Sequence, residues 1–169
     1  MDRTDFDKLR KKLAHLTDRE LVIVSNADLE NIIQKMLEAR LIDFNQKQQS
    51  GFAHNVRLAY SAGLIIGDVK DVLLNLAKLR NYFAHSAEAS SLEDAEAVKY
   101  LNAVIPLFKG FFADLAKGVT LPPEVSSGPL YRTLPNRLKA EVIYICLIKD
   151  LTNTISKITR LAIDKAMYS

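Results

Sequence analysis

Three residues have the types and the spacing that cleavage of a phosphodiester bond requires: Arg80, Asn81 and His85. Arg80 directly precedes Asn81, and His85 follows four residues after Asn81. On a helix, residues four apart are neighbours on one face, and the long side chain of Arg80 reaches the same patch. A guanidinium binds phosphate through a planar fork of donors, and an imidazole moves protons near neutral pH. We call these three residues the 80–85 motif; they are the candidate catalytic residues for general acid–base cleavage of RNA.

The same three residues also fit the end of an ordinary helix. Arg and His near a helix C-terminus interact favourably with the last carbonyl groups. Phe83, which lies inside the motif, is apolar and suits a core position. From residue types alone, this structural interpretation is preferred to the catalytic one.

The sequence indicates no other catalytic, metal or cofactor site. His15, His54 and His85 are far apart, and no His-Glu-x-x-His, Cys-x-x-Cys or acidic-loop pattern occurs. The glycines are isolated, so no glycine-rich phosphate loop is predicted. We expect no metal and no cofactor. His15 is interpreted as a surface residue and His54 as a residue at the start of a helix.

The elements that position the motif are predicted to be helices, because apolar residues recur every three or four positions along the chain. No alternating strand pattern is found. The prediction is an all-α, single-domain bundle of five to seven helices over residues 1–169, with a Pro-rich connection at about 119–135 before a long C-terminal helix. The expected helices are 4–14, 17–40, 52–60, 67–85, 91–117 and 135–166.

Local signals set some of the helix ends. Thr17 and Glu20 have the spacing of a capping box, which predicts a helix start at residue 17. Ser90 or Ser91 is expected to cap the fifth helix. Pro106 lies inside that helix and is expected to kink it or to split it in two.

Composition and charge place the chain among ordinary globular proteins. It has 169 residues, of which 49% are hydrophobic and 25% charged, with a formal net charge of +3. DNA-binding domains usually carry a larger and more clustered positive excess. The single cysteine, Cys146, lies in an apolar run and is interpreted as a buried thiol in a reducing compartment. No signal peptide or membrane span is indicated, so a cytoplasmic location is expected.

Residues 80–85 (RNYFAH) resemble the Arg-polar-x-x-x-His signature of HEPN (higher eukaryotes and prokaryotes nucleotide-binding) helical domains. In that superfamily the three positions can form a metal-independent ribonuclease site, usually assembled across a dimer of helical bundles. The resemblance implies a homodimer. It also implies an alternative function for Arg80, Asn81 and His85, either as an endoribonuclease acting on RNA or as a nucleotide-binding module without turnover.

A second resemblance covers most of the chain. Residues 52–65 (FAHNVRLAYSAGLI), the Pro-rich segment 121–123 and residues 151–158 (LTNTISKI) are similar, in this order, to the mannitol operon repressor (MltR-like) family. This resemblance implies an all-α cytoplasmic transcriptional regulator, repressor-like, that acts through a regulatory protein partner.

Direct DNA binding is not expected from the sequence. No pair of short helices with a polar recognition helix is indicated. Residues 130–169 carry an excess of Lys and Arg, but these are spread along a long helix and are interpreted as a solvated face. The leading expectation is therefore a non-enzymatic regulator, and the ribonuclease is the alternative.

Overall fold

The computed structural model describes residues 3–41, 51–116 and 135–167, and the side-chain surroundings within 8–41, 51–106 and 135–159. The described residues form helices and no strand, which confirms the predicted all-α bundle. The helices are α1 (Arg3–Ala14), α2 (Asp18–Arg40), α3 (Phe52–Ser61), α4 (Gly67–His85), α5 (Ala95–Ala116) and α6 (Asn136–Met167).

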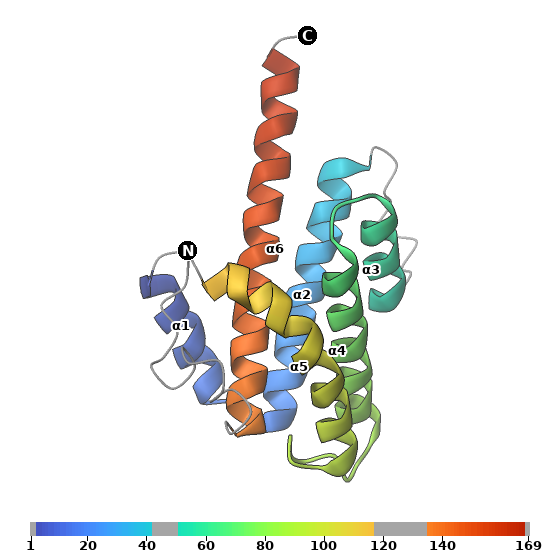
Figure 1. Ribbon diagram of the computed structural model, residues 1–169, viewed down its shortest axis with the longest axis vertical. Helices are drawn as coiled ribbons and strands as arrows, with labels where there is room; N and C mark the ends of the chain where they lie inside the picture. The colour runs from blue at the N-terminus through green and yellow to red at the C-terminus, as the bar shows by residue number, and fades with distance from the viewer. Residues whose placement is uncertain (1–2, 42–50, 117–134, 168–169) are drawn as a thin grey trace.

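Helix α2 is the central element of the bundle, because α3, α4 and α6 all pack against it. Helices α2 and α6 begin at the same end of the molecule and run side by side (Figure 1). Helix α4 runs in the opposite direction and is followed by α5, which packs against α4 and crosses to α6. The far end of α6 continues past the other helices (Figure 1).

The apolar stripes predicted from the sequence form the core. In α2 the residues of the stripe are fully buried apart from Ile32, which is partly buried, and in α4 every residue of the stripe is buried. These residues are Leu29, Ile33, Met36 and Leu37 in α2, and Val69, Val72, Leu76, Leu79 and Phe83 in α4.

Near its start, α6 is enclosed on all sides, because every residue from 139 to 147 is buried. Cys146 is one of them, as predicted, and burial raises the pKa of its thiol to about 12. The region also contains Lys139 and Glu141. The predicted solvated basic face of this helix therefore does not include its first turns.

The start of α2 follows the prediction, whereas the start of α5 does not. The Thr17 side chain accepts from the Glu20 N–H while the Glu20 carboxylate accepts from the Thr17 N–H, so the capping box is present. In contrast, the cap expected at Ser90 or Ser91 is wrong. Ser91 instead caps the short turn before α5, because its hydroxyl accepts from the Glu93 N–H. The backbone N–H groups of Ser90 and Ser91 donate to the Asp94 carboxylate, and α5 begins only at Ala95.

Two further expectations concern α5 and the connection that follows it. Helix α5 is a single helix with Pro106 inside it, so of the two expected outcomes, a kink or a division in two, the division is not observed. The Pro-rich connection expected at 119–135 lies almost entirely outside the described residues.

Within the described ranges, no helix combines the length and the apolar character needed to cross a membrane.

Candidate functional site

A cleft of about 530 Å³ opens between α2, the start of α3 and α4. It brings together segments that are far apart in the sequence, and we refer to it as the cleft. Its walls are formed by Ile23, Asn26, Ala27 and Glu30 of α2, by Gly51, Phe52, Ala53 and His54 at the start of α3, and by Ala77, Arg80 and Asn81 of α4.

Two residues of the 80–85 motif line this cleft. Arg80 and Asn81 are exposed, and Nη1 of Arg80 donates to Oδ1 of Asn81 over 3.2 Å. Among the described residues, no carboxylate forms an ion pair with Arg80. The guanidinium therefore retains donors for an anionic group, and Asn81 retains its amide N–H groups.

The third motif residue, His85, does not line the cleft. It is the last residue of α4 and is exposed, one helical turn beyond Asn81. Asn81 and His85 are therefore one turn apart on a helix, as predicted. However, one turn advances about 5.4 Å along the helix axis, which moves His85 away from Asn81. The cleft ends before this turn, so within one chain the structure groups Arg80 with Asn81 and leaves His85 outside.

His54, which the sequence indicated only as a residue at a helix start, does line the cleft. It is the third residue of α3 and its side chain is exposed. The N-cap of the helix is Gly51, which has no side chain to cap the first N–H groups. The first amides of a helix have no acceptor within the helix, and they carry its positive dipole end. His54 and this helix start therefore add hydrogen-bond donors on the side of α3.

The α2 wall has a different chemistry because its polar side chains offer acceptors. Glu30 supplies a carboxylate. Asn26 is only 4% exposed, and its Nδ2 donates to the carbonyl of Val22 over 2.9 Å and to the hydroxyl oxygen of Tyr144 over 2.6 Å. Its Oδ1 is buried and has no hydrogen-bond partner. Burial also raises the pKa of the Tyr144 phenol far above its ordinary value, so this hydroxyl stays protonated.

The cleft is therefore suited to binding a ligand with two different ends. The lining offers donors on α4 and at the start of α3, the Glu30 carboxylate on α2, and apolar side chains such as Phe52. Nowhere in the described part of the chain do three His, Cys, Asp or Glu side chains gather in a way that could hold a metal ion.

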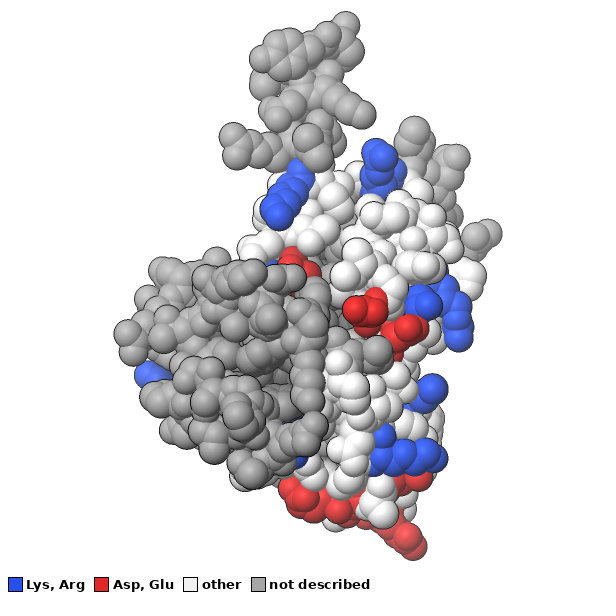
Figure 2. Space-filling view, in the orientation of Figure 1, with Lys and Arg blue, Asp and Glu red and all other residues white. Residues whose placement is uncertain are grey.

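The charged side chains on one face of the molecule do not form a basic track. Figure 2 shows Lys and Arg dispersed among uncharged and acidic side chains on the described part of this face. Acidic side chains gather at its lower end, where the connection between α4 and α5 lies (Figure 1). Glu88 and Glu93 of that connection are exposed. Phosphate backbones are bound through clustered cations, and this face does not present such a cluster.

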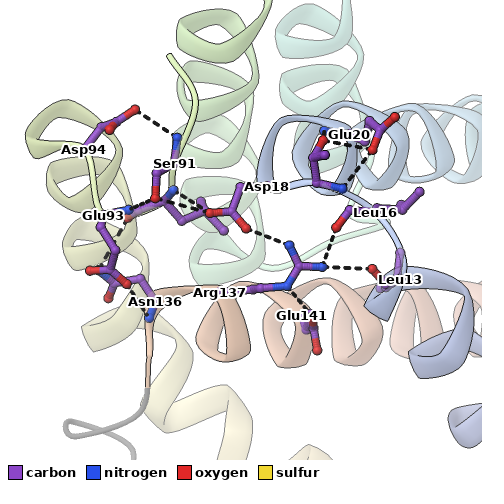
Figure 3. A network of polar contacts seen from close by, with 12 residues as sticks. Leu13, Leu16, Asp18, Glu20, Ser91, Glu93, Asp94, Asn136, Arg137 and Glu141 are labelled. Carbon is purple, nitrogen blue, oxygen red and sulfur yellow. Dashed lines mark hydrogen bonds and ion pairs between the residues drawn. The ribbon is translucent and has the colours of Figure 1, made fainter. Parts of the chain in front are cut away.

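A second polar group lies where α1, α2 and α6 meet (Figure 3). Arg137 donates to Asp18 over 2.6 Å, to the carbonyl of Leu16 over 2.7 Å and to that of Leu13 over 3.1 Å. Its Nε lies 3.1 Å from the Glu141 carboxylate. We refer to these residues as the Arg137 cluster.

The Arg137 cluster also holds the connection between α4 and α5. The second oxygen of Asp18 accepts from the N–H of Leu92 over 2.9 Å. Close by, the Glu93 carboxylate accepts from the backbone and side-chain N–H groups of Asn136, at the start of α6 (Figure 3). Every charged group of the cluster is paired within the protein, so we assign it a structural role.

No protein-family model, no curated protein and no solved structure matches this chain in the comparisons made. The function is therefore argued from the geometry of the cleft.

Proposed function

We propose that this protein is a non-catalytic regulatory protein that binds a small phosphate-bearing ligand in the cleft. The observation that carries the proposal is the position of Arg80. Its guanidinium lines the cleft, has no carboxylate partner among the described residues, and lies with Asn81 and His54 near the uncapped start of α3. A guanidinium binds phosphate through charge-assisted hydrogen bonds, and the N-terminus of a helix binds it through backbone N–H groups and the helix dipole.

The position of His85 favours ligand binding over RNA cleavage. The ribonuclease alternative requires Arg80, Asn81 and His85 to surround one phosphodiester. Because His85 is not part of the cleft wall, a single chain does not offer this arrangement around the cleft. The alternative therefore depends on a second chain, in keeping with the homodimer expected from the HEPN resemblance.

The regulatory part of the proposal rests on the resemblance to the mannitol operon repressor family. A repressor-like regulator that works through a protein partner needs a way to respond to metabolic state. A ligand that occupies the cleft would contact α2, α3 and α4 together, and so could shift how these helices pack. The mixed charge of the face shown in Figure 2 fits a protein partner better than direct contact with DNA.

Isothermal titration calorimetry with ribose 5-phosphate and with AMP tests the binding function. We expect Arg80→Ala to weaken binding of both probes by about tenfold or more, because a charge-assisted hydrogen bond to phosphate is lost. Arg57→Ala is the matched control, since Arg57 is an exposed arginine on α3 that does not line the cleft. Equal binding by wild type and Arg80→Ala would refute the proposal.

Incubation of the purified protein with structured and single-stranded RNA, with and without a chelator, tests the alternative. We expect no cleavage by the wild type. Robust cleavage that resists the chelator and is lost in both Arg80→Ala and His85→Ala would replace our proposal with the ribonuclease.

A further inference from the structure

We infer that the ligand of the cleft is an amino-sugar phosphate, whose phosphate pairs with Arg80 on α4 and whose ammonium group pairs with Glu30 on α2. The inference rests on the proposed phosphate-binding function and identifies the class of ligand. It starts from Glu30, a residue that neither the 80–85 motif nor either resemblance includes.

The negative charge of Glu30 is not compensated within the described part of the protein. Glu30 is partly buried in the wall of the cleft. On α2 itself, no Lys, Arg or His lies three or four positions away, where a helical partner would have to be. Among the other described residues, no cation forms an ion pair with it. A partly buried charge is more favourable when it is paired, so a ligand that brings a cation to Glu30 gains affinity.

The positive charge of Arg80 is in the same situation on the neighbouring helix. No Asp or Glu lies three or four positions from it on α4. Arg80 and Glu30 line the same cleft but form no ion pair with each other. The cleft therefore contains one unpaired cation and one unpaired anion, with a gap between them that a ligand can fill.

A ligand that carries phosphate alone fits this pair of charges poorly. Its phosphate would satisfy Arg80 but would bring further negative charge into the cleft that contains Glu30. Helices α2 and α4 pack against each other, and the axes of packed helices are about 8–10 Å apart. This separation is close to the screening length of about 8 Å at physiological ionic strength, so the repulsion is only partly screened. An ammonium group on the same ligand replaces this repulsion by an attraction.

The rest of the cleft suits a sugar ring between the two charged groups. The ligand has to span the gap between Arg80 and Glu30, and a ring with a phosphate on one side and an ammonium group on another does so. Ala27, Phe52 and Ala77 give the wall apolar surface against which the carbon skeleton of the ring packs. The volume of about 530 Å³ lies in the usual range of small-molecule sites.

The experiment compares two ligands that differ at one position. Glucosamine 6-phosphate carries an ammonium group where glucose 6-phosphate carries a hydroxyl, so their affinities for the full chain, measured by calorimetry near neutral pH, isolate the ammonium group. The informative variants are Glu30→Ala, which removes the carboxylate, and Glu30→Gln, which removes only its charge. Glu38→Ala is the matched control, because Glu38 is an exposed glutamate two turns further along α2 that does not line the cleft. Thermal unfolding establishes that each variant is folded.

We expect the wild type and Glu38→Ala to bind glucosamine 6-phosphate about tenfold tighter than glucose 6-phosphate. The preference should fall to about threefold in Glu30→Gln, because a hydrogen bond to a neutral acceptor is roughly half as strong. It should disappear in Glu30→Ala. The same variant should bind glucose 6-phosphate at least as tightly as the wild type does, since it no longer repels the phosphate. A general loss of structure would instead weaken both ligands.

Two outcomes would overturn the inference. One is equal affinity of the wild type for the two sugar phosphates, and the other is a preference that persists in Glu30→Ala. The proposed function is tested separately by Arg80→Ala with ribose 5-phosphate. If Arg80→Ala weakens that binding while either outcome occurs, the proposed function stands and this inference alone is lost. If Arg80→Ala leaves the affinity unchanged, the proposed function itself fails.

Discussion

The Arg137 cluster and the cleft each contain an arginine. The two arginines differ in how many of their hydrogen-bond donors are paired within the protein. Arg137 donates to two carboxylates and two backbone carbonyls, and its side chain is 31% exposed. For Arg80, which is exposed, the one hydrogen bond recorded to the described residues is with the amide oxygen of its neighbour Asn81. The two helix starts differ in the same way, because α2 carries a full capping box and α3 begins at Gly51 without a side-chain cap.

This difference separates polar residues that stabilise the fold from polar residues that remain free to bind a ligand. Partly buried charges need partners, and the Arg137 cluster supplies them from α1, α2 and α6 (Figure 3). Arg80 and the start of α3 are solvated instead, so a ligand can replace water there without breaking contacts between helices. The comparison predicts that mutations in the cluster reduce stability, whereas mutations in the cleft reduce binding.

The largest expected effect follows from Arg137→Ala. The substitution leaves the buried Glu141 without its partner and removes donors from two carbonyls, so we expect a loss of about 3 kcal/mol in the free energy of unfolding. Urea denaturation followed by circular dichroism measures this loss. Arg80→Ala is the matched change in the cleft and should alter the same free energy by less than about 0.5 kcal/mol. Similar losses for the two variants would remove the distinction between the cluster and the cleft.

The second prediction compares two exposed histidines, one inside the cleft and one outside. His54→Ala should weaken AMP binding by about tenfold, or about 1.4 kcal/mol, because His54 lines the cleft next to the proposed phosphate position. His85→Ala should leave the affinity unchanged. Calorimetric titration of each variant with AMP measures these affinities. A loss in His85→Ala alone would return the site to the three residues of the 80–85 motif.

The sequence predicted the helices well because their signals are local. The capping box of Thr17 and Glu20 and the stripe of α4 that ends at Phe83 are both set within a few turns of helix. The cap expected at Ser90 or Ser91 failed for a local and a tertiary reason. Locally, the Asp94 carboxylate accepts from the backbone N–H groups of Ser90 and Ser91, and α5 begins only after Asp94. Across the bundle, Asp18 of α2 accepts from the Leu92 N–H.

The candidate site was predicted in part, and the missing part is a matter of tertiary packing. Arg80 and Asn81 were found because their types and adjacency are visible in the sequence. His54 and Asn26 join them only because α3 and α2 pack beside α4, and no local pattern encodes that arrangement. Asn26 lies on the same helix as the stripe of Leu29 and Ile33, and only its unpaired oxygen distinguishes it from an ordinary buried amide.

The third prediction concerns the capped helix start beside the Arg137 cluster. Thr17→Ala removes the hydroxyl that accepts from the Glu20 N–H, so we expect a loss of about 1 kcal/mol in the free energy of unfolding at neutral pH. The backbone N–H of Thr17 and, to a smaller extent, its hydroxyl also lower the pKa of Glu20 in the folded protein, and the substitution removes the contribution of the hydroxyl. Stabilisation from a lowered carboxyl pKa is present above the ordinary value and is lost as the pH falls through the lowered one. Denaturation at neutral and at acidic pH should therefore show a smaller difference between variant and wild type in acid. A difference that stays constant with pH would contradict this assignment.

The smallest effect on stability, and the most direct test of the open helix start, comes from Gly51. Its backbone has φ −58°, and a Cβ built there meets no atom within 4 Å, so a side chain fits. Gly51→Ser and Gly51→Asp should each cap α3 and raise the free energy of unfolding by a few tenths of a kcal/mol. Their effects on AMP binding should differ, because the carboxylate of Gly51→Asp occupies the positive end of α3 and repels a phosphate, whereas the serine hydroxyl is neutral. We expect affinity to fall several-fold in Gly51→Asp and less in Gly51→Ser, whose hydroxyl occupies an N–H group of α3 without adding a charge. Equal affinities in the two variants would show that the bound phosphate lies away from α3, leaving Arg80 as its principal contact.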